Sequence, residues 1–226
     1  MQDSWQKYVA EAFATFAFVF IAAGSVLANW QTGGSLGTLG VALAHGLALT
    51  AMIYAVWHIS GAHLNPAVTV ALWATGHIKT LTGIGYILAQ LVGSVVAALF
   101  LKVVFVGVSP QYYLGDTTLG MGISPGMGIL VEALLTFFLV WTVFGTIVDK
   151  RTSSAGLGGL CVGMIMALGI MVGGHLTMGA LNPARSFGPA LVSSHWADHY
   201  VYWVGPIVGA LIASFVYHFG FMKKHA

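Results

Sequence analysis

The sequence predicts an all-α membrane protein with six transmembrane helices and two shorter helices that enter the membrane without crossing it. Three observations carry this prediction: few charged residues, repeated long apolar runs, and two short apolar runs that each follow an Asn-Pro pair. Of the 226 residues, 58% are hydrophobic and 6% are charged. This is the composition of a chain that crosses a bilayer several times rather than of a soluble domain.

The six candidate transmembrane helices are apolar windows bounded by turn signals. Each is long enough to cross a hydrocarbon core about 30 Å thick. They cover residues 8–28, 37–58, 83–106, 127–148, 156–175 and 200–221.

Two further apolar pieces are too short to cross the membrane. Residues 66–74 and 183–192 provide about 15 Å of helix each, roughly half of the hydrocarbon thickness. Proline disfavours a helical conformation at the residue before it and suits the first helical position. We therefore expect Asn65 and Asn182 to be N-caps, with the half-helices beginning at the prolines that follow.

The residues that precede each half-helix are predicted to be irregular backbone at membrane depth. These segments are Ser60–Leu64 and Thr177–Leu181. Lipid cannot satisfy their carbonyl and N–H groups, so they must be buried in protein or line a water-filled cavity. Gly61, Ala62 and His63 are therefore candidates to line or support a passage.

The two halves of the chain resemble each other. "EAFATF" at Glu11 matches "EALLTF" at Glu132, and "HLNPAVT" at His63 matches "ALNPARS" at Ala180. With three spans in each half, the second copy must enter the membrane from the opposite side. We expect one domain over residues 1–226, built from inverted repeats at approximately 1–115 and 116–226.

Glu11 and Glu132 are intramembrane carboxylates, which are functional candidates by default. They could belong to a proton relay. Their repeat-related positions instead favour a role as anchors for backbone N–H groups of the irregular segments, because a relay needs a chain of titratable groups.

Two half-helices that meet at the midplane direct two positive dipole ends at one point, which repels cations. Each capping Asn can also direct amide hydrogens at a passing water, which opposes proton transfer along a file of waters. The pattern predicts a passive pore that excludes ions and protons. No nucleophile with a positioned base and no metal-ligand cluster is evident, so we expect no enzyme, no metal, no cofactor and no nucleic-acid partner.

The basic residues fall in alternate connections, which predicts that both termini are cytoplasmic. A cell membrane is favoured over a vacuolar or other internal membrane. The residues that carry this prediction are Lys7, Lys79, Lys150, Arg151, Lys223 and Lys224.

The stretches "SGAHLNPAVT" from Ser60 and "GALNPARSFGPA" from Gly179, with the two Glu-containing openings, make the chain resemble the aquaporins, also called major intrinsic proteins. The resemblance implies a six-helix bundle in a lipid bilayer, one pore per protomer, and a homotetramer. It places two Asn-Pro-Ala motifs at the pore, namely Asn65, Pro66 and Ala67 and then Asn182, Pro183 and Ala184.

Counting from these motifs places the family's selectivity filter at His45, Ile170, Gly179 and Arg185. An intramembrane Arg is a functional candidate that donates to water and repels cations. This set resembles that of tonoplast-type aquaporins, which pass ammonia as well as water. The resemblance therefore implies that water and small neutral solutes are the partners of this chain.

Three points stay open. Ammonia-permeable members can also place a His after the third span, and residues 107–126 contain none. Glycerol facilitators typically carry an Asp after the filter Arg and a basic residue four positions later, where this chain has Ser186 and Ala190. A non-conducting junction protein would share all the motifs.

Overall fold

The computed structural model describes residues 5–107, 110–152 and 156–222, in which helices are joined by turns and loops and no strand occurs. Lys223 and Lys224, which contributed to the predicted topology, lie outside these residues. The elements are α1 (Gln6–Gln31), α2 (Gly37–Ser60), α3 (Pro66–Ala74), α4 (Thr80–Val104), a 3-10 turn η1 (Pro110–Gly115), α5 (Pro125–Val143), a π-helical turn η2 (Phe144–Val148), α6 (Gly158–Gly173), α7 (Pro183–Ser193) and α8 (Val201–Gly220).

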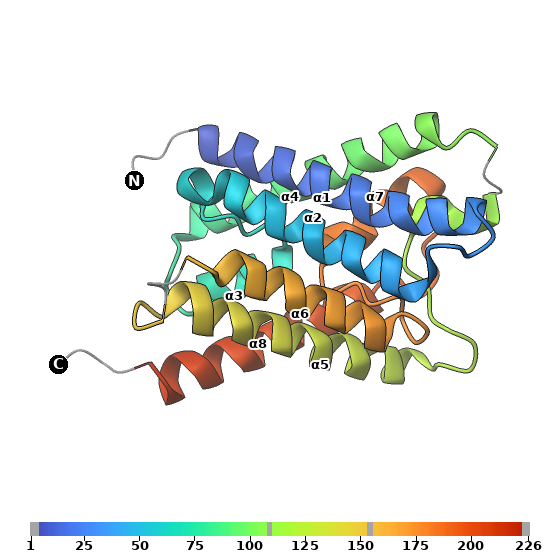
Figure 1. Ribbon diagram of the computed structural model, residues 1–226. Helices are drawn as coiled ribbons and strands as arrows, with labels where there is room; N and C mark the ends of the chain where they lie inside the picture. The colour runs from blue at the N-terminus through green and yellow to red at the C-terminus, as the bar shows by residue number, and fades with distance from the viewer. Residues whose placement is uncertain (1–4, 108–109, 153–155, 223–226) are drawn as a thin grey trace.

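The long helices form one bundle in which both ends of the chain emerge on the same side (Figure 1). We call the side where α1 begins and α8 ends the terminal end, and the opposite side the distal end. Within each half the first and last helices pack together, α1 on α4 and α5 on α8, while α2 packs on α6 across the halves. Each half-helix packs on the last long helix of the other half, α3 on α8 and α7 on α4. The two halves therefore interlock.

The half-helices begin where the sequence predicted, at Pro66 and Pro183. The segment before α3 differs slightly from the prediction. Ser60 is still the last residue of α2, and the helix is ended by Gly61 in the left-handed conformation, with φ of 85°. Glycine reaches this conformation without a Cβ penalty, which makes it a common helix terminator. The irregular backbone therefore starts one residue later than expected.

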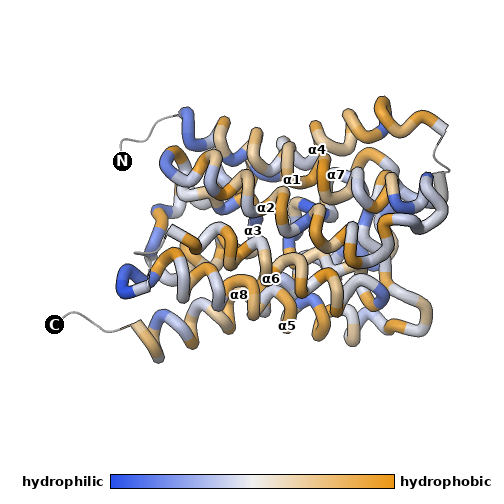
Figure 2. The backbone as a smooth tube through the Cα atoms, in the orientation of Figure 1, coloured by the Kyte–Doolittle hydropathy of each residue, from blue (hydrophilic) through white to orange (hydrophobic). Residues whose placement is uncertain are grey.

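In the described part of the chain, five helices are long and apolar enough to cross a membrane. The predicted span over 156–175 was too long, because α6 has 16 residues, or about 24 Å of helix, and the chain turns after Gly173. Hydrophobic residues run along the helices, whereas the hydrophilic segments gather at the ends and around the two half-helices (Figure 2). Large apolar side chains such as Leu47, Leu81 and Val103 are exposed on the flank, as expected for a surface that faces lipid.

Close contact between the helices depends on glycine at symmetric positions. A Cβ on Gly93 would overlap the carbonyl oxygen of Ala12, where α4 crosses α1. A Cβ on Gly209 would overlap the carbonyl oxygen of Ala133, where α8 crosses α5. Backbone atoms cannot move aside as a flexible side chain can, so any larger residue must push the helices apart.

We expect Gly209→Ala to lower the stability of the bundle by about 1–3 kcal/mol, the usual range for overpacking. The measurement is the thermal midpoint of the detergent-solubilised protein. Gly126→Ala is the matched control, because a Cβ on Gly126 meets nothing within 4 Å. Equal midpoints for the two variants would show that the α5–α8 contact does not require glycine.

Candidate functional site

The N-termini of α3 and α7 are capped by the two motif asparagines. The Asn65 Oδ1 accepts from the Ala67 N–H at 2.8 Å, and the Asn182 Oδ1 accepts from the Ala184 N–H at 2.9 Å. Both asparagines have extended backbone, with φ of −152°, which is the usual N-cap conformation. Each cap uses the amide oxygen and leaves the Nδ2 hydrogens for other partners.

Those amide nitrogens join the two half-helices across the middle of the protein. The Asn65 Nδ2 donates to the Leu181 carbonyl at 2.8 Å, and the Asn182 Nδ2 donates to the Leu64 carbonyl at 2.9 Å. Each Nδ2 carries two hydrogens, so one remains after this bond. The reciprocal pair fixes the two asparagines relative to each other.

Glu11 of α1 holds the segment before α3. Its Oε1 accepts from the Ser60 hydroxyl at 2.7 Å and the His63 N–H at 2.9 Å. Its Oε2 accepts from the Leu64 N–H at 2.8 Å and the Gln90 Nε2 at 2.7 Å. Glu11 is fully buried, so these four donors offset the cost of removing a carboxyl group from water.

Glu132 of α5 holds the segment before α7 in the same way. Its Oε1 accepts from the Thr177 hydroxyl at 2.6 Å and the Ala180 N–H at 2.9 Å, and its Oε2 accepts from the Leu181 N–H at 2.8 Å. Each carboxyl group therefore binds one hydroxyl and two backbone N–H groups at matching positions of the two halves.

The segments held by these carboxyl groups contain non-glycine residues with positive φ. Ala62 and Leu64 have φ of 50° and 52°, and Met178 and Leu181 have φ of 63° and 52°. Left-handed backbone at such residues costs of order 1–3 kcal/mol each and persists only where the surroundings enforce it. The two carboxyl groups supply that enforcement, because each accepts from N–H groups within these segments.

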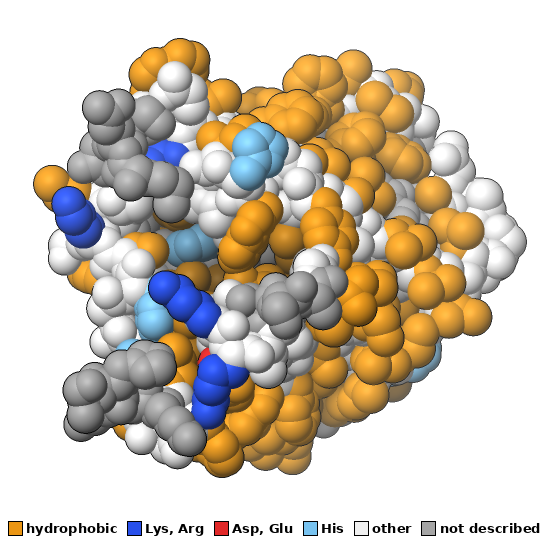
Figure 3. All heavy atoms as spheres, turned by 60° about the vertical axis from the view of Figure 1, so that its left-hand side comes forward, with side chains coloured by type: hydrophobic (Ala, Val, Ile, Leu, Met, Phe, Trp, Pro, Cys, Tyr) orange, Lys and Arg blue, Asp and Glu red, His pale blue; other side chains and the backbone are white. Residues whose placement is uncertain are grey.

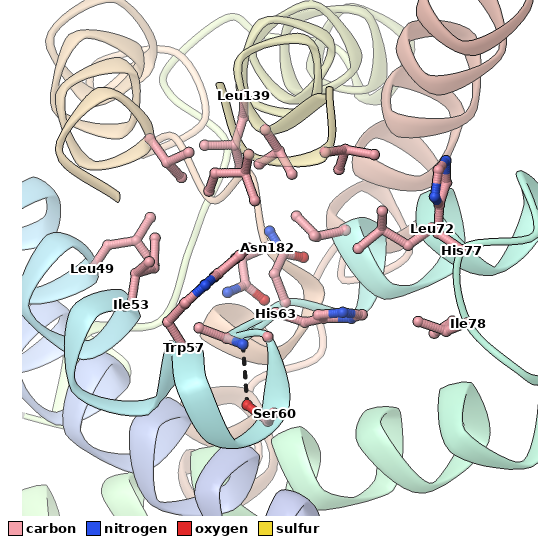
Figure 4. A pocket seen from close by; sticks show the side chains of 18 of the residues that line it. Leu49, Ile53, Trp57, Ser60, His63, Leu72, His77, Ile78, Leu139 and Asn182 are labelled. Carbon is pink, nitrogen blue, oxygen red and sulfur yellow. Dashed lines mark hydrogen bonds between the residues drawn. The ribbon is translucent and has the colours of Figure 1, made fainter. Parts of the chain in front are cut away.

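A cavity of about 450 Å³ extends from the two asparagines toward the terminal end (Figure 4). Gly61, Ala62, His63, Asn65 and Asn182 all line it. Most of the remaining lining is apolar, from α2, α3, α5, η2 and α6, and includes Leu49, Ile53, Val68, Leu72, Leu139, Val143, Ile147, Val162 and Met166. The result is an apolar passage with polar groups concentrated at the asparagines.

The ring of His63 is fixed at the edge of this cavity. Its Nδ1 lies 3.1 Å from the Thr69 Oγ1, and the ring packs edge-on against Tyr86 with centroids 4.9 Å apart. Both side-chain contacts and the backbone bond to Glu11 restrict its rotation.

The four residues predicted as a filter do not line this cavity. His45 of α2 and Arg185 of α7 are both buried. Gly179 lies against Ile170 of α6, where a Cβ would come within 3.2 Å of the Ile170 Cα. With φ of 62°, position 179 favours glycine for its backbone conformation as well as for this contact.

Arg185 is fully buried, and its Nη1 donates to the Gly115 carbonyl at 2.7 Å. Among the described residues, the Arg185 Nε and Nη2 atoms and the His45 Nε2 atom have no hydrogen-bond partner. The other ring nitrogen of His45, Nδ1, lies 2.8 Å from the Val41 carbonyl. Buried polar atoms without partners cost about 1–3 kcal/mol each.

The sequence did not predict the contacts that hold the connection after α4 in place beside Arg185. Asp116 lies next to Gly115 and bonds the His195 Nδ1 through its Oδ2 at 2.9 Å. The His195 ring stacks on Tyr113 with centroids 3.9 Å apart. A lone acid and a lone histidine 79 residues apart give no periodic or motif signal, so only the fold brings them together.

We expect Glu132→Gln to reduce solute flux and lower the thermal midpoint. A glutamine offers one accepting oxygen and an NH2 group, so at least one buried backbone N–H of the 177–181 segment loses its partner, at a cost of about 1–3 kcal/mol. Flux into proteoliposomes and the midpoint in detergent measure the effect. Asp198→Asn, which changes a carboxyl group in a distal loop, is the control. An equal loss of flux and of thermal midpoint in that variant would contradict the anchoring role of Glu132.

The sequence that forms this site matches a known protein family. The major intrinsic protein family matches residues 1–217 of the chain. Aquaporin TIP4-4 of Zea mays is 43% identical over 223 residues, which cover 96% of this chain and 86% of that protein. Aquaporin-4 of Mus musculus is 40% identical over 227 residues, covering 97% of this chain and 68% of that protein.

Among solved structures, the aquaglyceroporin from Plasmodium falciparum superposes with a TM-score of 0.82 at 28% identity. The match covers 94% of this chain and 95% of that one. These findings confirm the resemblance to tonoplast-type aquaporins and the predicted fold class. They indicate a transport protein of the membrane and no family of enzymes. The chain belongs to the major intrinsic protein family and has the fold of an aquaporin channel.

Proposed function

We propose that the chain is a passive channel for water and ammonia, and that both pass between His45, Ile170, Gly179 and Arg185 and then along the two asparagines. The observation that carries this proposal is the set of unpartnered buried atoms at His45 and Arg185. A molecule that can both donate and accept fits between them.

The direction of these hydrogen bonds follows from the Val41 contact. A carbonyl only accepts, so the Nδ1 of His45 carries a hydrogen, and in the neutral ring Nε2 is then an acceptor. Arg185 only donates. Water and ammonia each offer hydrogens to His45 and a lone pair to Arg185. Ammonium and metal cations have no lone pair for Arg185, and their charge is repelled by the guanidinium group.

The asparagines add a second barrier. Their remaining Nδ2 hydrogens, together with the positive ends of α3 and α7, orient a water molecule with its oxygen toward the pair. Such a water cannot accept from its neighbours on both sides, which interrupts proton transfer along a file.

A histidine contacts the connection after α4, although residues 107–126 themselves contain no histidine. His195 reaches this connection from the loop after α7 and holds Asp116 and Tyr113. Its contacts keep the Gly115 carbonyl beside Arg185.

Glycerol is the second candidate, since one relative in structure is named an aquaglyceroporin. Ser186, at the position where glycerol facilitators typically have Asp, is fully buried and accepts from the Thr117 hydroxyl at 2.7 Å. It is thus committed to the connection after α4 rather than to a polyol, and water and ammonia remain the preferred solutes. A non-conducting junction protein would show no flux at all.

We further propose that residues 1–226 form one domain of two inverted repeats that meet near residue 115, and that four such protomers assemble in the bilayer. Both termini are assigned to the cytoplasm. Four described basic residues, Lys7, Lys79, Lys150 and Arg151, lie at the terminal end, as expected of a cytoplasmic side. Lys102 is an exception, because it lies in the last turn of α4 at the distal end. A cell membrane is preferred over an internal one.

We expect His45→Phe combined with Ile170→His to keep water flux and to lose ammonia entry by about tenfold, the equivalent of about 1.4 kcal/mol for one lost hydrogen bond. Stopped-flow light scattering of proteoliposomes measures water and glycerol entry, and an internal pH dye measures ammonia entry. Gly126→Ala is the control. Ammonia entry that is absent from the wild type, or glycerol entry as fast as that of water, would overturn the assignment of solutes.

We expect water flux to fall between pH 7.5 and 5 with a midpoint near pH 6. Burial raises the pKa of Asp116 to about 6, against the opposing effects of His195, the Thr117 N–H and Arg185. Below that pH the carboxyl group gains a proton and loses its negative charge, which weakens its bond to His195, so the Gly115 carbonyl is released from Arg185. Asp116→Asn should remove the pH dependence. A response unchanged in that variant would assign it to another group.

A further inference from the structure

Two histidines meet at the terminal end, away from the four residues of the proposed filter. His77 lies in the connection between α3 and α4, and His218 lies in the last turn of α8. The His77 Nε2 and the His218 Nδ1 are 3.3 Å apart, and the ring planes are 86° from parallel. The two ring nitrogens therefore face each other across two separate elements.

The spacing of these nitrogens suits one shared metal ion. Zinc binds imidazole nitrogen at about 2.0–2.1 Å, and two such bonds at a tetrahedral angle separate the nitrogens by about 3.3 Å. In the absence of an ion the same distance allows one N–H···N hydrogen bond between the rings, which an ion would replace.

The rings are held in place before any ion binds. The backbone N–H of His77 donates to the Leu72 carbonyl at 2.8 Å, which holds the connection against the end of α3. The His77 ring packs edge-on against Phe144 with centroids 5.7 Å apart, and the His218 ring packs edge-on against Phe219 at 4.8 Å. Little side-chain freedom remains to be lost on binding, which favours affinity.

The pair stands at the mouth of the cavity. His77 lines the cavity that leads to the asparagines, as its position beside Leu72 shows (Figure 4). Basic and His side chains lie on one side of a hollow at the terminal end, and hydrophobic side chains border much of the rest (Figure 3). Lys150 lines the same cavity and opposes an incoming cation. In the described part of the chain no third His, Cys, Asp or Glu joins the pair, so waters must complete the coordination.

We propose that His77 and His218 form a two-imidazole site for a divalent ion of the Zn²⁺ or Cu²⁺ class, and that the bound ion obstructs the terminal mouth of the channel. Neutral imidazole suits these metals, with Cu²⁺ bound more tightly than Zn²⁺. The obstruction rests on the proposed channel function, whereas the binding of the ion does not.

Binding is tested by calorimetry of the purified full chain with ZnCl₂, and by electron paramagnetic resonance with one equivalent of CuCl₂. We expect saturable binding and a signal from two coordinating nitrogens. His77→Gln and His218→Gln should each weaken Zn²⁺ binding by at least about tenfold, since loss of even an outer partner costs 10–100-fold. His58→Ala, an exposed histidine at the terminal end of α2, should change nothing. His225→Ala, outside the described residues, is the second control.

Obstruction is tested by water flux into proteoliposomes with and without ZnCl₂, with each variant compared to its own metal-free flux. We expect Zn²⁺ to reduce water flux through the wild type and to leave water flux through both Gln variants unchanged. Absence of copper–nitrogen signals in the wild type, or binding unchanged in both Gln variants, would overturn the site. Binding without inhibition would overturn the obstruction alone. Absence of metal-free flux would instead count against the proposed function.

Discussion

The fold depends on one constraint: backbone polar groups at membrane depth must find partners inside the protein. A continuous helix satisfies this by itself, but a half-helix needs an irregular segment to reach it. Glu11 and Glu132 solve the problem by placing one carboxyl group behind each segment, where it accepts from two N–H groups and one hydroxyl. Without them the strained residues Leu64 and Leu181 would lose the partners of their backbone N–H groups.

The same constraint generates the polarity of the proposed pore. Capping uses the amide oxygen of each asparagine, so only donors are left to face the passage. One donor of each pair then joins the opposite segment, which fixes the position of the other. A structural requirement of helix ends and a functional requirement for oriented donors are thus met by the same two side chains. The apolar lining of the cavity leaves these donors as its main polar feature.

The distal side is assembled differently, from contacts between loops and helices of both halves. Arg185 is held by the Gly115 carbonyl, and the connection that carries Gly115 is held in turn by Asp116 on His195. Burial makes each of these bonds stronger than it would be in water and makes its loss more costly. The orientation of the guanidinium therefore depends on residues that do not contact it.

The sequence by itself determined the architecture, because its signals are local. Apolar length predicts the spans, and the Asn-Pro pairs predict where α3 and α7 begin, since a proline acts on its immediate neighbours. The end of α6 was misjudged, because glycines at 173 and 174 allow either helix or turn. Only the tertiary structure decided which side chains meet beyond the motifs. The pairs of Gly115 with Arg185, Asp116 with His195 and His77 with His218 lie 70, 79 and 141 residues apart. No periodicity links such residues; they meet only because the interlocked halves bring distant connections together.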